Sequence, residues 1–216
     1  MGLYVTPSPD FRKRRTQRHK AMSANIPTVV STKWLADRLS AHPRNFIVLD
    51  GSLQPPITKR ESRKEFLMEH IPTAQFFDID DCRDKSTDVA HMLPSPEEFS
   101  QYVGNLGIDN KTHVVVYDND NMVGMLTAQR VWWTFRVFGH DSVSVLDGGL
   151  PKWKKDGYRL TNIVEKVEKK QFKSVFRPEM VTTFDEIASN LETNEFTLVD
   201  TRSPGRYEGT APEPNP

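Results

Sequence analysis

Among the side chains of this 216-residue sequence that could act as nucleophiles, the first to consider is a thiol. Cys82 is the only cysteine, so the chain forms no intramolecular disulfide, as is usual for a reducing compartment. Cys82 lies in the stretch DIDDCRD, where neighbouring carboxylates raise the pKa of a thiol and suppress its reactivity. Because reactive cysteines prefer electropositive surroundings, we interpret Cys82 as a structural thiol.

Metal binding is the next chemistry that these residue types could support. The acids near Cys82 together with His91 suggest a metal site, but their wide separation and oxygen ligands match no zinc spacing. The loop that begins at Asp118 is not a calcium loop, because Val123 replaces the glycine of the turn and Gln129 replaces the bidentate glutamate. We therefore expect no metal ion and no cofactor.

The stretch 112–139 could form an anion site or hold a nucleophile. Residues 114–117 are β-branched or aromatic, which predicts a strand buried on both faces of a parallel sheet. Apolar residues then recur at helical spacing from Leu126, and Gly139 is placed to end the helix in a left-handed conformation. Such a strand end, opposite a helix N-terminus, is a common position for anion sites and nucleophiles. Here the first loop residue is Asp118, a carboxylate.

Strands and helices alternate around this central stretch. The pattern predicts strands at 46–50, 74–78 and 143–146, and helices from Ser31 or Thr32 to Leu39, around 61–70, from 95 to 106 and around 151–155. Alternation of this kind indicates an α/β domain with a mostly parallel central sheet flanked by helices, spanning 28–160.

Composition and charge exclude several function classes. Lys plus Arg and Asp plus Glu are both 29, but residues 1–25 hold six basic residues and one acid. The remaining 23 basic and 28 acidic residues make the body mildly acidic, which argues against nucleic acid as a partner. No apolar run approaches the roughly 18 residues of a membrane span, so we expect no membrane partner.

The N-terminal segment 1–27 is predicted to be a basic disordered tail. It has no apolar core typical of a secretory signal. An organelle-import segment is the alternative, although Pro7 and Pro9 interrupt any amphipathic helix. We accordingly expect a cytoplasmic protein, with a mitochondrial one as the alternative.

The C-terminal part repeats the beginning of the first domain. Residues 161–180 lose the alternating pattern and are predicted to be a linker. Then 183–191 and 196–200 echo 31–39 and 46–50, each as a capped helix followed by a strand that ends in aspartate. We therefore predict an incomplete second copy over 181–216, in which no counterpart of 112–139 is present.

Several stretches together resemble one family. These are VSTKWLADRL, RKEFLMEHIPTAQFFDIDDCRD, HMLPSPEEFSQYVGNLGI, THVVVYD, RVWWTFRVFGHDSVSVLDGGLPKW and FTLVDTRSPGRYEGTAPEP. In order and spacing they resemble the tandem-domain sulfurtransferases of the rhodanese family. The resemblance implies two rhodanese domains, the first non-catalytic and the second carrying a cysteine persulfide. It also implies transfer of sulfur from 3-mercaptopyruvate or thiosulfate to a thiol, cyanide or protein acceptor, with thioredoxin-like proteins among the candidate partners.

The same resemblance assigns roles to three residues. It implies that Asp80 and His91 support proton transfer, and that Arg206 binds the carboxylate or thiosulfate of the donor. Asn215 departs from the family pattern, since mercaptopyruvate-type members carry a second substrate arginine there. Outside the family context, His91 and Arg206 are simply a loop histidine and a turn arginine.

Two functions follow from these expectations. The first is a sulfurtransferase whose nucleophile loop is not within 1–216, so that this chain is inactive alone. The second is a non-catalytic rhodanese-like module that binds an anion or a protein.

Overall fold

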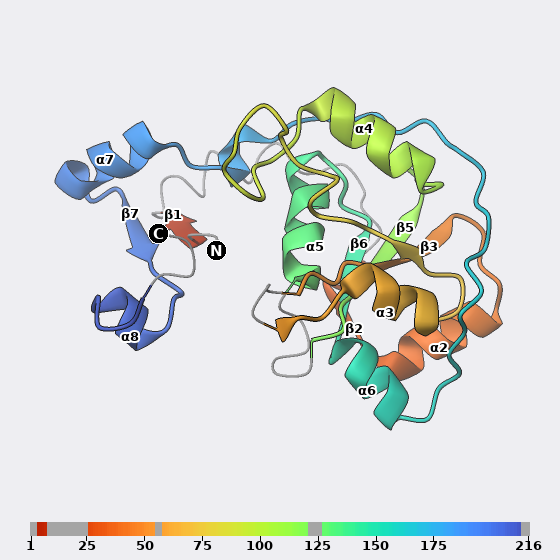
Figure 1. Ribbon diagram of the computed structural model, residues 1–216. Helices are drawn as coiled ribbons and strands as arrows, with labels where there is room; N and C mark the ends of the chain where they lie inside the picture. Colours follow the sequence, from red (N-terminus) through yellow and green to blue (C-terminus); the bar gives the residue numbers. More distant parts are fainter. Residues whose placement is uncertain (1–3, 8–25, 55–57, 121–126, 213–216) are drawn as a thin grey trace. The chain divides into compact units, whose positions relative to one another are not determined.

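The computed structural model describes residues 4–7, 26–54, 58–120 and 127–212 (Figure 1). The described residues form two units. The larger unit ends at Arg177, and the smaller unit is made of residues 4–7 together with Pro178 onward.

The larger unit contains a five-stranded sheet in which every neighbouring pair is parallel. The order is β2-β6-β5-β3-β4, with bounds of Val29–Val30, Val143–Leu146, His113–Tyr117, Phe46–Asp50 and Gln75–Phe76. In the centre, Val48 pairs with Val115 and Asp50 with Tyr117. The carboxyl ends of β3 and β5 are therefore level, which places the loops that follow them at one edge of the sheet.

Helices cover both faces of this sheet (Figure 1). One core contains residues of α4 (Pro96–Asn105) and α5 (Ala128–Val137) with Val114 and Val116. The other contains residues of α2 (Thr32–Ser40), α3 (Ser62–Met68) and α6 (Gly149–Lys155) with Val48 and Val115. Successive side chains of β5 point into opposite cores because a strand has a two-residue period. The predicted α/β class and the parallel sheet are confirmed.

Local signals in the sequence set the helix ends. Ser31 caps α2, its Oγ accepting from the Trp34 N–H at 3.1 Å. Ser95 and Glu98 form a capping box at α4. Gly139 follows α5 with φ of 85°, the left-handed conformation predicted for it.

Residues 161–177 pack along the rest of the larger unit. Phe172 is buried, the Lys170 N–H donates to the Gly104 carbonyl at 2.9 Å, and Arg177 forms a 2.7 Å ion pair with Asp141. Most of the stretch predicted as a linker over 161–180 thus contributes to the first unit. The Lys- and Glu-rich composition did not predict this packing, because it rests on backbone hydrogen bonds, a buried aromatic side chain and an ion pair between residues far apart in the sequence.

The smaller unit contains the helix and strand predicted for the second copy, as α7 (Phe184–Thr193) and β7 (Phe196–Val199). The short helix α8 (Pro204–Tyr207) follows, and η2 (Pro178–Met180) precedes them. β1 (Tyr4–Pro7) pairs antiparallel with β7. Residues 4–7 were predicted to belong to a disordered tail, but their aromatic and β-branched residues suit strand pairing. Residues 8–25 of that predicted tail lie outside the described residues.

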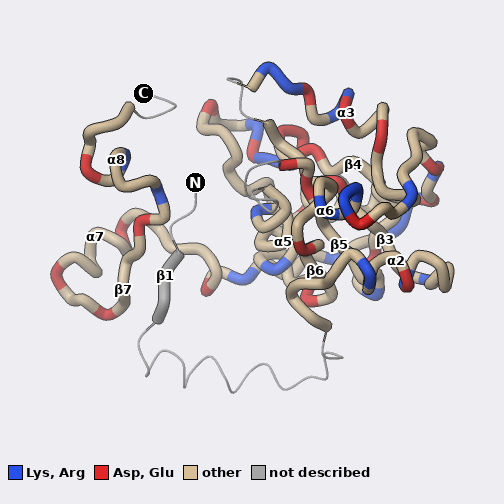
Figure 2. Tube along the Cα trace, turned by 90° about the horizontal axis from the view of Figure 1, so that it is seen from below, with Lys and Arg blue, Asp and Glu red and all other residues tan. Residues whose placement is uncertain are grey.

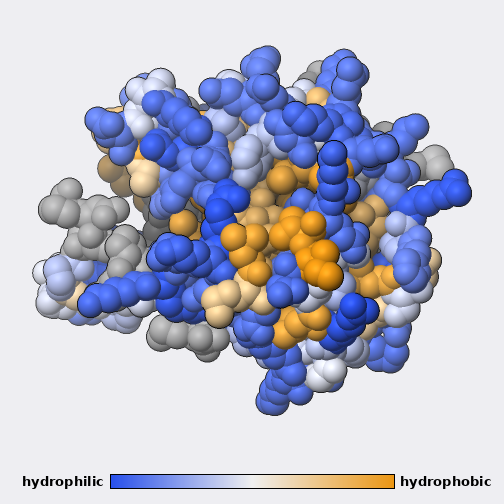
Figure 3. Space-filling view, turned by 45° about the vertical axis from the view of Figure 1, so that its right-hand side comes forward, coloured by the Kyte–Doolittle hydropathy of each residue, from blue (hydrophilic) through white to orange (hydrophobic). Residues whose placement is uncertain are grey.

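The surface of the larger unit mixes charge and apolar area. Figure 2 shows basic and acidic residues interspersed along its trace. Figure 3 shows an apolar area framed by hydrophilic side chains, and the exposed apolar residues of this unit include Leu67, Met68, Ile163 and Val164. Within the described ranges, no helix is both long and apolar enough to cross a bilayer.

Candidate functional site

The side chain of Asp118 fills the N-terminal end of helix α5. Its Oδ2 accepts hydrogen bonds from the backbone N–H groups of Thr127 and Ala128 at 2.8 and 2.9 Å, and the residue is 1% exposed. These N–H groups are ones that helix geometry leaves unsatisfied, and they carry the positive end of the helix dipole. Burial raises the pKa of Asp118, while the two N–H groups oppose that rise. The anion position expected at this strand end therefore exists, and the chain's own carboxylate occupies it.

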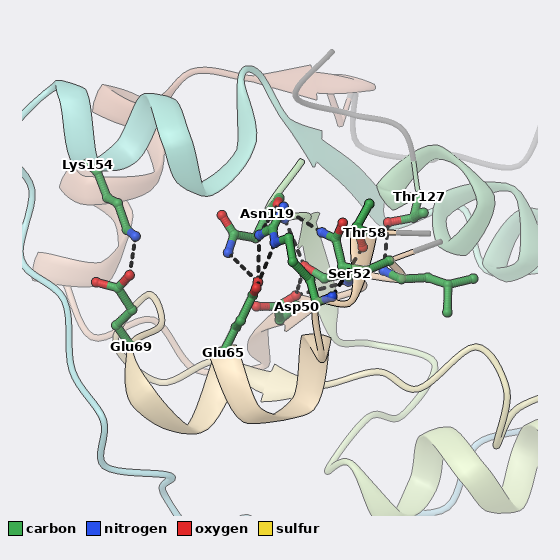
Figure 4. A network of polar contacts seen from close by, with 11 residues as sticks. Asp50, Ser52, Thr58, Glu65, Glu69, Asn119, Thr127 and Lys154 are labelled. Carbon is green, nitrogen blue, oxygen red and sulfur yellow. Dashed lines mark hydrogen bonds and ion pairs between the residues drawn. The ribbon is translucent and has the colours of Figure 1, made fainter. Parts of the chain in front are cut away.

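A second carboxylate, Asp50, lies at the end of the neighbouring strand (Figure 4). Its Oδ1 accepts from the Ser52 hydroxyl at 2.5 Å and from the Ser52 N–H at 3.0 Å. The Ser52 Oγ in turn accepts from the Asn119 N–H at 2.8 Å, so the loops after β3 and β5 are joined. Burial raises the pKa of Asp50 to about 6, although the Ser52 bonds lower it.

Helix α3 contributes a third part of this polar network. Glu65 points toward Asn119 in Figure 4 and accepts from its side-chain amide at 3.0 Å. The Arg60 guanidinium binds Glu65 with two bonds of 2.7 and 2.6 Å, and it also donates to the Asn119 carbonyl at 3.0 Å. A cavity of about 250 Å³ lies beside these residues, with an ion pair between Lys154 and Glu69 in its lining. It is smaller than the roughly 300 Å³ at which small-molecule pockets begin.

Asp80 and His91 are brought together in the loop between β4 and α4. The His91 Nδ1 lies 3.5 Å from the Asp80 Oδ1, and the His91 and Asp80 side chains are 42% and 57% exposed. His91 has φ of 63°, and its carbonyl accepts a hydrogen bond from Arg130 on α5. An acid next to an imidazole can hold a tautomer and carry a proton, which is the chemistry that the resemblance implies for this pair.

Cys82 lies in the same loop but is buried, at 7% exposed. Its pKa is raised to about 12, first by burial and then by Asp81 and Glu98. The structure agrees with the interpretation of a structural thiol and changes its main cause, since burial outweighs the acidic neighbours that are visible in the sequence. At neutral pH a thiol with this pKa supplies almost no thiolate.

Arg206 lies in α8 of the smaller unit, whereas Asp80 and His91 belong to the larger unit. In the same unit, Asp200 accepts hydrogen bonds from the Arg202 side chain at 3.1, 2.8 and 2.6 Å. Arg206 was expected in a turn, whereas the structure places it in this short helix; its role in binding a donor remains a prediction.

Three features of these sites were not found from the sequence. Ser52 and Asn119 are turn residues without a distinctive signal, although the aspartate that ends strand 46–50 pointed to this edge. The Arg60–Glu65 pair has a spacing that is typical of no motif. Arg130 was interpreted only as a polar residue of an amphipathic helix, because its partner is a backbone carbonyl far away in the sequence.

Comparison with known proteins finds a matching domain family and similar sulfurtransferases. The rhodanese-like domain family pattern matches residues 31–156. Thiosulfate sulfurtransferase of Bos taurus is 49% identical over 189 residues, covering 87% of this chain and 63% of that protein. Human 3-mercaptopyruvate sulfurtransferase is 43% identical, and the match covers 86% of this chain and 63% of the human protein. The chain thus spans less than two thirds of these relatives.

A solved structure supports the same fold. The crystal structure of SseA from Escherichia coli, presented with the rhodanese fold and mechanism of 3-mercaptopyruvate sulfotransferases, superposes with a TM-score of 0.71. It is 32% identical in sequence, and the match covers 77% of this chain and 62% of SseA.

Proposed function

The chain belongs to the rhodanese-like domain family, and from that premise we propose that it contributes the first, non-catalytic half of a sulfurtransferase. The donor is 3-mercaptopyruvate or thiosulfate, and the acceptor is a thiol, cyanide or a thiol protein such as a thioredoxin-like one. The observation that carries the non-catalytic assignment is the Asp118 carboxylate at the N-terminus of α5. A carboxylate in this position can be held as an anion but cannot accept sulfane sulfur.

The proposed reaction requires a cysteine thiolate, and Cys82 is a poor candidate because of its raised pKa. We place the nucleophile outside residues 1–216. With thiosulfate, the thiolate attacks the outer sulfur, a S–S bond forms, and sulfite leaves with the electron pair of the broken S–S bond. With 3-mercaptopyruvate, the thiolate attacks the donor sulfur and a S–S bond forms. The C–S bond breaks, its electron pair stays on the carbon, and the thiol proton is transferred to that carbon to give pyruvate.

Only the second donor requires protonation of carbon, and this gives Asp80 and His91 a specific role. We propose that His91 carries that proton and that Asp80, 3.5 Å from its Nδ1, holds the imidazole. Arg206 is proposed to bind the anionic end of either donor, since a guanidinium matches carboxylate and sulfonate oxygens with paired N–H groups.

The alternative function, a non-catalytic module that binds an anion or a protein, is weaker in its anion form. The helix N-terminus that would hold the anion is already neutralised by Asp118, which is buried there. A protein-binding module would need a partner surface that no contact in the described residues identifies.

The proposal is tested by measuring sulfide release from 3-mercaptopyruvate with a dithiol, and thiocyanate formation from thiosulfate with cyanide. We expect the 1–216 chain alone to show neither activity. We expect the same chain, joined to the remaining C-terminal part of bovine thiosulfate sulfurtransferase, to turn over at least one donor. Turnover by 1–216 that disappears in Cys82→Ser would overturn the placement of the nucleophile, and a folded but inactive joined chain would overturn the sulfurtransferase proposal.

The joined chain also separates the two donors. We expect His91→Gln to reduce kcat with 3-mercaptopyruvate at least tenfold and to leave thiosulfate turnover within about twofold, because only the former donor needs a proton on carbon. Equal losses with both donors would refute the role of His91 in proton transfer.

For the compartment, we propose a cytoplasmic protein, with a mitochondrial one as the alternative if the basic segment within 1–25 directs import. Fractionation of cells that express the chain with a C-terminal tag distinguishes the two. A tagged protein of reduced mass in the mitochondrial fraction would indicate import and cleavage.

A further inference from the structure

We propose that Arg130 is a positioning residue that holds His91 against Asp80. This inference rests on the proposed function for its catalytic meaning. The structural claim, that one arginine of α5 fixes the geometry of the Asp80–His91 pair, can be tested independently of any activity.

The first observation is the contact between α5 and the loop. The terminal nitrogen of Arg130 donates to the carbonyl oxygen of His91, which lies 39 residues earlier in the chain. His91 has φ of 63°, a left-handed conformation that costs a non-glycine residue free energy and persists only where surrounding contacts fix it. A charge-assisted hydrogen bond to the carbonyl of this same residue is such a contact.

The second observation is that the Arg130 side chain is itself held in place. Its guanidinium carbon lies 4.5 Å from the ring centroid of Trp133, a cation–π arrangement. The helix that carries it is also anchored, because Asp118 binds the N–H groups of Thr127 and Ala128 in the first turn. The hydrogen bond therefore connects the His91 loop to a helix whose N-terminus is bound by Asp118.

The third observation is that the Asp80–His91 contact is sensitive to position. Nδ1 of His91 is shielded from solvent and makes no hydrogen bond within the part of the chain that the structure describes. The Asp80 oxygen is 3.5 Å away, longer than a formed hydrogen bond, so the contact is easily lost as the loop moves. A loop released from α5 would let His91 leave the left-handed conformation and turn away from Asp80.

The experiment uses nuclear magnetic resonance of the imidazole nitrogens in the 1–216 chain. The chain has six histidines, so the His91 signals are assigned by their loss in His91→Gln. The measured quantity is the change in the His91 ring ¹⁵N shifts caused by Asp80→Asn at one fixed pH, which reports how strongly Asp80 acts on the ring. We expect Arg130→Met, which keeps the aliphatic stem and removes the donors, to reduce this change at least twofold.

Two further variants distinguish positioning from general loss of stability. Arg136→Met is the matched control, because Arg136 lies on the same helix and also lies over a tryptophan, Trp132 at 5.7 Å, but pairs with Asp141. We expect it to leave the Asp80-dependent change intact. Arg130→Lys keeps a cation and a donor, so we expect it to retain part of the change.

An Asp80-dependent change of the same size in wild type and in Arg130→Met would overturn the proposal. A loss of the same size in Arg136→Met would also overturn it, since the effect would then follow from a weakened helix. If Arg130→Met does not fold, the Arg130→Lys and Arg136→Met pair still decides the question. None of these results depends on sulfur transfer, so failure of the proposed function leaves this test valid.

Discussion

Replacing Asp50 by asparagine should remove a pH-dependent loss of stability from the larger unit. Asp50 is 2% exposed at the end of a central strand, and its Oδ1 accepts two hydrogen bonds from Ser52. The asparagine side-chain oxygen can accept the same two bonds from Ser52, so the variant removes the titratable charge and keeps this contact.

The magnitude follows from the pKa, which burial raises from 3.8 to about 6 in the folded protein. A carboxyl whose pKa is raised on folding stabilises the protein below its unfolded pKa, and that stability is lost as pH rises through the folded pKa. Because a pKa difference of one corresponds to about 1.36 kcal/mol, ionisation of Asp50 costs the folded state about 3 kcal/mol in total. About half of this, roughly 1.4 kcal/mol, is lost between pH 5 and pH 8.

The assay is urea unfolding followed by tryptophan fluorescence at several pH values from 5 to 8. The four tryptophans, at positions 34, 132, 133 and 153, all lie in the larger unit, so the signal reports that unit alone. We expect the unfolding free energy of wild type to fall by about 1.4 kcal/mol relative to Asp50→Asn as pH rises across this range. Asp37→Asn is the control, because it also removes one carboxylate but Asp37 lies in an exposed ion pair with Lys33, and such pairs contribute little to stability. Parallel pH curves for wild type and Asp50→Asn would refute the reasoning.

Three other predictions follow from the same structure. Asp118→Ala should lower the unfolding free energy by about 3 kcal/mol, because two buried N–H groups of α5 lose a charged acceptor, and Asp118→Asn should lose less in the same urea assay. Gly104→Ala should lower the unfolding free energy by about 2 kcal/mol or more, because the added Cβ would collide with the Lys170 carbonyl. Its control is Gly157→Ala, where the Cβ meets no atom, so only the positive φ should lower the unfolding free energy, by about 1 kcal/mol. Cys82 should react with a thiol reagent at neutral pH only as the protein unfolds, so rapid labelling of the native chain would contradict its burial and raised pKa.

The periodic parts of the fold could be predicted because single residues and short patterns determine them. Ser31 and Ser95 mark helix starts, Gly139 marks a helix end, and the apolar run ending at Tyr117 could only be a buried strand. The same logic identified Asp118 as the side chain at the strand end, since its position depends only on where one strand stops.

The remaining features depend on contacts between residues far apart in the sequence. Packing of residues 163–177 along the larger unit relies on backbone hydrogen bonds such as that from Lys170 to Gly104, and on contacts of Phe172 and Arg177 that leave no periodic pattern in the sequence. The pairing of β1 with β7 joins residues near the two ends of the described chain. It was not predicted, because the basic composition of the N-terminal segment indicated a disordered tail. Asp80 and His91 were identified only through a family resemblance, because two polar residues in an irregular loop have no periodic signal.

Helix α5 contacts both features of the larger unit that the proposed function uses, namely Asp118 at the anion position and the loop that carries His91. Its N-terminus binds the carboxylate of Asp118, and its first full turn carries the arginine that binds the His91 carbonyl. In a catalytic rhodanese domain a helix N-terminus of this kind would stabilise a thiolate or persulfide. Here the carboxylate of Asp118 occupies that position. In the function that we propose, a domain of this architecture contributes to an active site by fixing the His91 loop rather than by holding the nucleophile.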